Sequence, residues 1–183
     1  MNPRVIHQLF PEDFNKSLRD QLQRSAEWRL CLDEHYRPGM QPDLFSDTGL
    51  VYYTYTRDRD WHSLAQQDPA RGYFNSQAES ILHSALSKIA VTDAVIHRVM
   101  WNYYNRSSQG IQHQDYDQPG LYSMVYNLSD TDGGTEIQGE FYQGHAGCAV
   151  IFPSEYEHRG RGPTAEPRRF VLNCIFSADF GDK

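Results

Sequence analysis

The sequence predicts a mainly β domain, a double-stranded β-helix (jelly roll) buttressed by helices near the N-terminus. Helical spacing of apolar residues is confined to the first half of the chain, whereas short β-branched and aromatic runs between turn residues fill the second half. In addition, His113 and His158 lie 45 residues apart. This is enough chain for several antiparallel strands to return beside the first, as a jelly roll requires.

The length favours one domain. A chain of 183 residues is typical of a single domain and can bury a sizeable core. Within residues 1–183 we expect a helical and substrate-loop region over about 1–92 and a jelly-roll core over about 93–177. No repeat, linker or low-complexity tract interrupts this order.

The N-terminal region is predicted to hold a short strand over 5–10 and two helices. Pro11, Glu12 and Asp13 favour a helix start, and Phe14, Leu18 and Leu22 recur every four residues, which predicts a helix toward Trp28. The second helix is predicted from a capping box, Ser76-x-x-Glu79, and from apolar residues at helical spacing: Ala78, Ile81, Leu82, Ala85, Leu86 and Ile89.

The remaining elements are predicted strands. A strand is expected over 50–56, before the charged turn 57–60. Instead of packing in the core, its Tyr52, Tyr53 and Tyr55 could form a substrate lid together with Arg57 and Arg59 of the turn. Later strands are expected over 95–104, 111–116, 122–128, 134–137, 139–142, 148–152 and 169–176. Turn residues over 130–134 and 144–147 separate some of them.

A metal chelate is predicted around His113. In a strand, side chains two residues apart share a face, so His113 and Asp115 can reach one point while Gln114 faces away. His158 would complete a set of two histidines and one carboxylate, which leaves three positions open on a non-haem Fe(II) and suits oxygen chemistry. Three ligands and a water also describe catalytic zinc, which stays open on these residues alone.

An arginine at the start of the last strand adds a second requirement. The run from Arg169 to Phe176 is apolar enough to be buried, and burying an arginine without a carboxylate partner is costly. No acid of the chain stands out as that partner, so a ligand carboxylate is the natural candidate. An iron site that needs a carboxylate-bearing co-substrate points to 2-oxoglutarate.

These residues together resemble a known family. His113-x-Asp115, Gly133-Gly134-Thr-Glu-Ile137, Gly147-Cys-Ala-Val-Ile-Phe-Pro153, His158 and Arg169-Phe-Val-Leu172 are similar in order and spacing to the Fe(II)/2-oxoglutarate-dependent dioxygenases, prolyl 4-hydroxylase-like type. The resemblance covers about Val95 to Phe176. H-x-D alone is a weak signal, whereas the ordered set is strong.

The resemblance implies roles for specific residues. His113, Asp115 and His158 would bind iron, and Arg169 would bind the 5-carboxylate of 2-oxoglutarate, with Arg168 as its rival. Arg169 is preferred because Phe170 follows it, as the family pattern has it, and because strand alternation lets only one of the two arginines face inward. Tyr104 and Asn102 are further candidates for the co-substrate pocket; Gly110 stands where relatives usually have an aromatic residue.

The implied reaction needs Fe(II), 2-oxoglutarate and O2, with ascorbate as a candidate reductant. 2-Oxoglutarate would be oxidised to succinate and CO2 while a small molecule or a peptide or protein side chain is hydroxylated. Because Asp115 already fills the carboxylate position, hydroxylation is favoured over halogenation.

Two other classes remain open. Asn102-x-Tyr104 also resembles the AlkB-like nucleic-acid or nucleoside demethylases, although their second arginine is missing from the last strand. The formal net charge of −7 does not favour nucleic acid as a partner. The other alternative is a non-catalytic, metal-binding jelly-roll module.

Composition bounds the rest. Three cysteines, Cys31, Cys148 and Cys174, have no metal spacing and are expected to be reduced in a cytoplasmic protein. No apolar stretch of membrane-spanning length and no signal peptide pattern is present. The other histidines are interpreted as surface, packing or loop residues: His7, His35, His62, His83, His97 and His145. Oligomeric state and substrate identity are not encoded in these motifs.

Overall fold

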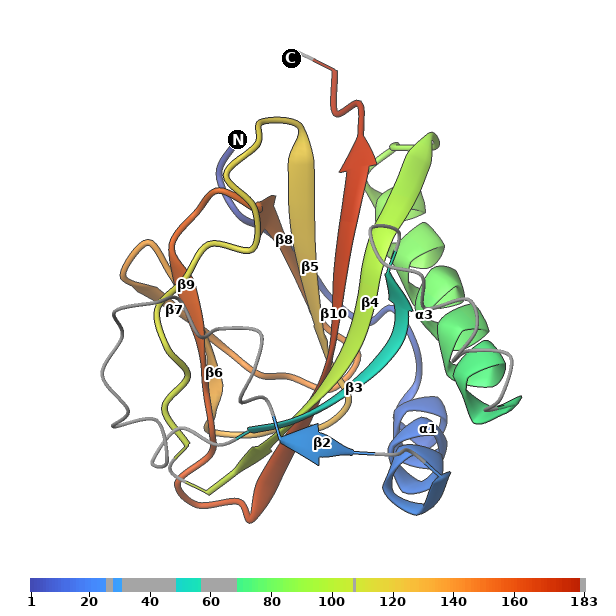
Figure 1. Ribbon diagram of the computed structural model, residues 1–183, viewed down its shortest axis with the longest axis vertical. Helices are drawn as coiled ribbons and strands as arrows, with labels where there is room; N and C mark the ends of the chain where they lie inside the picture. Colours follow the sequence, from blue (N-terminus) through green and yellow to red (C-terminus); the bar gives the residue numbers. More distant parts are fainter. Residues whose placement is uncertain (26–27, 31–48, 57–68, 107, 182–183) are drawn as a thin grey trace.

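Two antiparallel β-sheets and two helices form three layers in the computed structural model, which describes residues 1–25, 28–30, 49–56, 69–106 and 108–181. The larger sheet lies in the middle, with the smaller sheet over one face and the helices over the other (Figure 1). The jelly-roll class predicted from the sequence is confirmed.

The larger sheet has seven strands in the order β1-β8-β5-β10-β4-β3-β2. Their bounds are β1 Arg4–Ile6, β2 Arg29–Leu30, β3 Gly49–Thr56, β4 Ala94–Asn105, β5 Leu121–Asn127, β8 Ala149–Pro153 and β10 Arg168–Ala178. The smaller sheet has the order β7-β6-β9, with β6 Gly134–Ile137, β7 Glu140–Gln143 and β9 His158–Arg161. Strands far apart in the sequence are therefore neighbours, as β10 between β4 and β5 illustrates.

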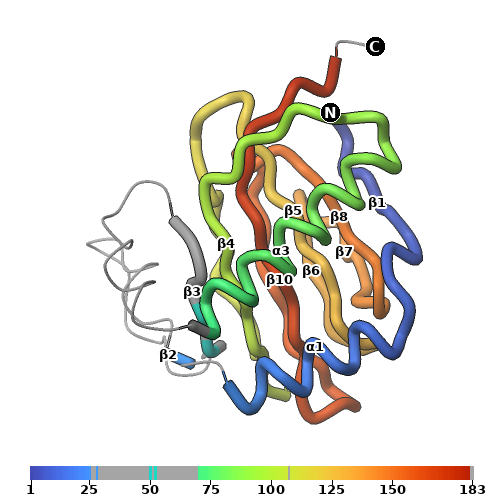
Figure 2. Tube along the Cα trace, turned by 90° about the vertical axis from the view of Figure 1, so that its right-hand side faces the viewer, coloured from blue at the N-terminus to red at the C-terminus, as the bar shows by residue number. Residues whose placement is uncertain are grey.

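Both helices cover the outer face of the larger sheet (Figure 2). Helix α1 spans Glu12–Ser25 and α3 spans Pro69–Lys88. The apolar stripes predicted for both helices are buried: Leu18, Leu22, Ala78, Ile81, Leu82, Ala85 and Leu86 are at most 1% exposed. Phe74 of α3 packs edge-on against Trp101 of β4, which joins the helix layer to the sheet.

The two faces of β10 differ: one packs in the core under the helices, and the other faces the smaller sheet and carries more polar side chains. Phe170, Leu172 and Cys174 belong to the core under the helices. Side chains alternate along a strand, so Arg169, Val171 and Asn173 point the other way, between the sheets. Val171 there packs with Val125, Val150 and Phe152 of the larger sheet and with Ile137 of the smaller one. This inner face holds the candidate site.

Most predicted strands are present with shifted ends, but the prediction of a strand over 111–116 is wrong. The chain over 109–113 pairs with β9 only through two isolated bridges, Gln109 with Arg161 and His113 with His158, of which the second alone lies in the predicted strand. At Asp115 the backbone N–H instead donates to Ser154 O, just beyond the end of β8. The chain therefore diverges from β9 after these bridges, and no continuous strand pairing exists between the two segments. Strand β9 itself was not predicted, because His158-Arg-Gly-Arg161 lacks β-branched and aromatic residues.

The capping box predicted at Ser76 is also wrong as a helix start. Helix α3 begins seven residues earlier, at Pro69, because burial of Phe74 extends the helix toward the N-terminus. Proline suits a first helical position, where its missing N–H would have no partner in any case. Glu79 accepts a hydrogen bond from Asn75 Nδ2, and Ser76 O accepts one from Ser80 Oγ.

Several expectations fall outside the described residues. These are Arg57 and Arg59 of the candidate lid, Cys31, His35 and His62. Cys148 and Cys174 are free and buried. Within the described ranges, no helix combines the length and the apolar character that crossing a membrane would require.

Truncation of the α3 stripe should destabilise the fold. Leu82 is fully buried, so Leu82→Ala removes apolar burial and leaves a cavity, with an expected loss of about 2–5 kcal/mol in the free energy of unfolding. His83→Ala, at the exposed neighbouring position, is the matched control and should change it by less than about 0.5 kcal/mol. Urea unfolding measures both. Equal losses would contradict the packing of α3 described above.

Candidate functional site

A single antiparallel backbone pair brings His113 and His158 together. The His113 N–H donates to His158 O and the His158 N–H donates to His113 O, both at 2.9 Å. Residues that exchange both bonds lie directly opposite each other, with side chains on the same face. The two imidazole ring centres are consequently 4.4 Å apart.

Glycines allow this close approach. A Cβ on Gly110 would lie 2.6 Å from Gly160 O, and a Cβ on Gly160 would lie 2.2 Å from Tyr104 Oη. Gly110 N also donates to Gly160 O at 2.8 Å. No side chain fits between these backbones, so position 110 cannot hold an aromatic residue in this arrangement. Tyr104 of β4 instead places its hydroxyl against Gly160.

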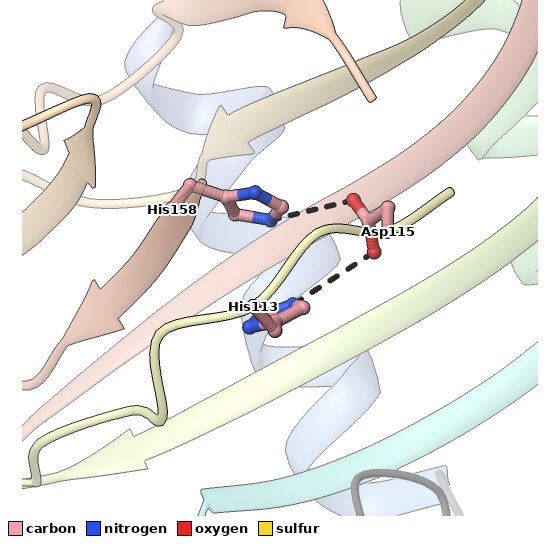
Figure 3. Close-up of side chains that lie close together, drawn as sticks. All are labelled: His113, Asp115 and His158. Carbon is pink, nitrogen blue, oxygen red and sulfur yellow. Dashed lines mark ion pairs between the residues drawn. The ribbon is translucent and has the colours of Figure 1, made fainter. Parts of the chain in front are cut away.

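The three predicted metal ligands converge (Figure 3). Each of His113, Asp115 and His158 offers one ligand atom, and these atoms all lie within 4.8 Å of one another. Asp115 Oδ1 is 3.9 Å from His113 Nε2, and Asp115 Oδ2 is 3.4 Å from His158 Nε2. Asp115 and His158 are buried, with side chains 1% and 4% exposed, whereas His113 is 25% exposed. The group is therefore open to solvent on the His113 side.

Backbone carbonyls fix the histidine tautomers. His113 Nδ1 lies 2.8 Å from Ile111 O, and His158 Nδ1 lies 2.9 Å from Tyr156 O. A carbonyl oxygen can only accept, so Nδ1 must donate in both rings. In the neutral rings Nε2 then carries the lone pair, and both Nε2 atoms face Asp115. A neutral imidazole whose other nitrogen donates to a backbone carbonyl is a usual form of a metal-binding histidine.

Asp115 and His158 stabilise each other's charged forms, and Arg98 adds to the stabilisation of the Asp115 carboxylate. Burial alone would raise the pKa of the Asp115 carboxyl, but the Arg98 cation and then His158 outweigh it and hold this pKa well below its usual range. Burial alone would lower the pKa of His158, but the Asp115 carboxylate outweighs burial and raises it. Asp115 is thus a carboxylate at any pH near neutrality.

Arg169 lies on the inner face and Arg168 is exposed, as strand alternation predicted. The Arg169 side chain is 1% exposed. It donates to neutral acceptors: Asn127 Oδ1 at 3.1 Å, Gly134 O at 2.6 Å and Thr135 Oγ1 at 3.0 Å. In the part of the chain that the structure describes, it forms no ion pair with a carboxylate. Burial lowers its pKa to about 10.

Asn102 and Tyr104 share the inner face of β4 with this arginine. Tyr104 pairs with Arg169 across the strands, and its ring centre lies 5.3 Å from the guanidinium carbon. Asn102, opposite Val171, is 8% exposed, and its Oδ1 accepts no hydrogen bond among the described residues. A buried acceptor of this kind is suited to a ligand.

Sequence reasoning missed Arg98 and Ser123, which both contact the Asp115 carboxylate. Arg98 is followed by the apolar residues Val99, Met100 and Trp101 of β4, a setting that suggests a buried partner for the charge. No feature of the sequence distinguishes Ser123 from the other serines.

Comparison with known proteins gives structural neighbours only. No protein-family model matches the sequence, and no curated protein matches it. Among solved structures, a Pseudomonas putida prolyl-4-hydroxylase is 15% identical, with 96% of this chain and 91% of that chain covered and a TM-score of 0.58. HygX from Streptomyces hygroscopicus, solved with nickel and 2-oxoglutarate bound, is 12% identical, with 97% and 83% covered and a TM-score of 0.64.

A third neighbour is a viral collagen prolyl hydroxylase from Paramecium Bursaria Chlorella virus-1, 12% identical, with 97% and 96% covered and a TM-score of 0.51. The likeness in all three cases extends over nearly the whole of this chain. The protein therefore has the fold of the 2-oxoglutarate- and Fe(II)-dependent oxygenases, among them the prolyl 4-hydroxylases.

Proposed function

We propose that the protein is a non-haem Fe(II)- and 2-oxoglutarate-dependent dioxygenase that hydroxylates a small molecule or a peptide side chain. One observation carries the proposal. Two histidine Nε2 atoms and a carboxylate converge beside β9. The same strand contacts buried Arg169, which forms no ion pair with a carboxylate among the described residues.

The donor set suits Fe(II). Two imidazoles and one carboxylate leave three coordination positions open, enough for a chelating co-substrate and oxygen. His113, Asp115 and His158 would hold the metal, and nickel bound in HygX is consistent with this assignment. Catalytic zinc would use the same three ligands, but a zinc site gives no reason for a buried arginine nearby whose acceptors, among the described residues, are all neutral.

Arg169 would hold the far carboxylate of 2-oxoglutarate. Its Nη1 lies 3.4 Å from Arg161 O, three residues along β9 from His158. At the rise per residue of a strand, the backbone positions of residues 158 and 161 are about 10 Å apart. A five-carbon dicarboxylate that chelates a metal at one end and accepts hydrogen bonds from an arginine at the other would span about this distance between metal and guanidinium. We assign Tyr104 and Asn102, which share this inner face, to the same co-substrate site.

The protein's own contribution would be binding, orientation and shielding. When bound, Fe(II) and 2-oxoglutarate would supply oxidation by O2, with succinate and CO2 released and a C–H bond of the substrate hydroxylated. Burial of Asp115, His158 and Arg169 excludes water from the inner side of the site. The substrate would approach on the more exposed His113 side.

Succinate formation tests the proposal. Protein, Fe(II), 2-oxoglutarate and O2 are incubated with a panel of small molecules and peptides, and succinate is quantified by mass spectrometry. We expect formation that depends on both Fe(II) and 2-oxoglutarate and that His113→Ala, Asp115→Ala and His158→Ala each abolish while the fold persists. Folded protein that binds neither Fe(II) nor 2-oxoglutarate would contradict the proposal, and binding of metal alone would favour a non-catalytic module.

Arg169→Ala should weaken 2-oxoglutarate binding far more than metal binding. Losing one partner of a shielded charge pair costs about 3–5 kcal/mol, equivalent to a loss in affinity of a hundred- to several-thousand-fold. Arg168→Ala is the matched control because Arg168 is exposed on the same strand, and its effect should be mild. Isothermal titration with 2-oxoglutarate in the presence of Mn(II) measures both. Reversed effects would identify Arg168 as the anchor.

Metal affinity should fall as the pH drops. Protons compete with metal for His158 Nε2, and because the pKa of His158 is raised above its ordinary value of 6.5, competition begins above that pH. Asp115 adds no competition there, since its pKa is lowered. Below the His158 pKa we expect about a tenfold loss per pH unit for each protonated ligand. Mn(II) titrations between pH 8 and 5.5 check this, and constant affinity would exclude histidine ligation.

A further inference from the structure

The backbone around Asp115 does not by itself orient its carboxylate. Asp115 follows the His113 bridge, belongs to no strand, and donates its N–H to Ser154 O at 3.1 Å. Strand alternation therefore cannot fix the direction of this side chain, in contrast to His158 within β9. Other contacts must hold the carboxylate toward the two histidines.

Those contacts come from the larger sheet. Arg98 Nη2 of β4 forms an ion pair with Asp115 Oδ1, and Ser123 Oγ of β5 donates to Asp115 Oδ2 at 2.7 Å. Arg98 Nη2 also lies 3.5 Å from Asn173 Oδ1 of β10, and Ser123 Oγ lies 2.9 Å from Ser154 Oγ. A polar chain across three strands thus holds both carboxylate oxygens.

The Arg98 side chain lies on the inner face of the larger sheet. Val99 and Trp101, its neighbours on β4, belong to the core under the helices, so Arg98 points the other way. Its side chain is 14% exposed and that of Asp115 is 1% exposed, so little water screens the pair. The guanidinium is planar and always charged, which fixes the direction of its hydrogen bonds.

We propose that Arg98 is the positioning residue for Asp115: it orients the carboxylate toward His113 and His158 without binding the metal itself. The inference rests on the proposed function, because it assigns Asp115 to the metal. It goes beyond the ligand triad by adding the group that makes the carboxylate a preorganised ligand.

Two opposite effects would follow from removing Arg98. Loss of orientation weakens metal binding, by about 10–100-fold for groups that hold a metal ligand. Loss of a nearby cation removes repulsion and strengthens metal binding. Orientation should dominate, because the Asp115 carboxylate lies between the guanidinium and the histidines and offsets much of the repulsion. The sign of the change therefore distinguishes a positioning residue from a mere neighbouring charge.

The test uses Co(II), whose visible absorption reports both affinity and coordination geometry. Arg98→Met should lower Co(II) affinity by about 10–100-fold and change the spectrum. Arg98→Lys keeps the cation and should lose less. Ser123→Ala, which removes the second contact, should also weaken binding, whereas exposed Arg168→Met is the matched control and should leave affinity and spectrum unchanged. Thermal unfolding verifies that each variant is folded.

Unchanged or tighter Co(II) binding by folded Arg98→Met would overturn the inference, as would equal losses in Arg98→Met and Arg98→Lys. If Arg98→Met does not fold, Arg98→Lys decides, and an unchanged affinity and spectrum in that variant would overturn it. The unmodified protein separates the two claims. If it does not bind Co(II), the proposed function fails and the inference fails with it; if it binds and the variants do not differ from it, only the inference fails.

Discussion

The reciprocal hydrogen bonds between His113 and His158 are the contact on which the site depends. They join a segment without strand structure to β9, and they place two imidazoles opposite each other on the inner face. The approach is possible because Gly110 and Gly160 present no side chains between the backbones. Once the rings are opposed, the carbonyls of Ile111 and Tyr156 direct both Nε2 atoms inward. Backbone geometry, more than side-chain packing, builds this half of the site.

The other half depends on the contrast between the two faces of the larger sheet. The outer face is apolar and packs under α1 and α3, which provides a rigid support. The inner face carries Arg98 and Arg169, at different positions along the adjacent strands β4 and β10. Arg98 has an acid of the protein as its partner, whereas Arg169 is surrounded by neutral acceptors. A buried cation held in this way is costly unless an anion joins it, and this cost is the basis of the proposed dicarboxylate co-substrate.

The sequence predicted the fold class and the convergence of His113, Asp115 and His158, but partly for reasons that the structure corrects. His113 and Asp115 do point to one place, although no strand alternation directs them. The bridge to β9 and the contact from Arg98 direct them instead, and both depend on residues distant in the sequence. The long strands β4, β5 and β10 were predictable from their apolar character. In contrast, β9 was missed because pairing with β6, and not residue propensity, makes it a strand.

The most direct test of the account is a crystal structure of the protein with Ni(II) and 2-oxoglutarate, with the metal located by its anomalous scattering. The account predicts a metal bound by His113 Nε2, Asp115 and His158 Nε2, with the distal carboxylate of 2-oxoglutarate on the Arg169 guanidinium. A metal at any other position, or a 2-oxoglutarate molecule that does not contact Arg169, would contradict it.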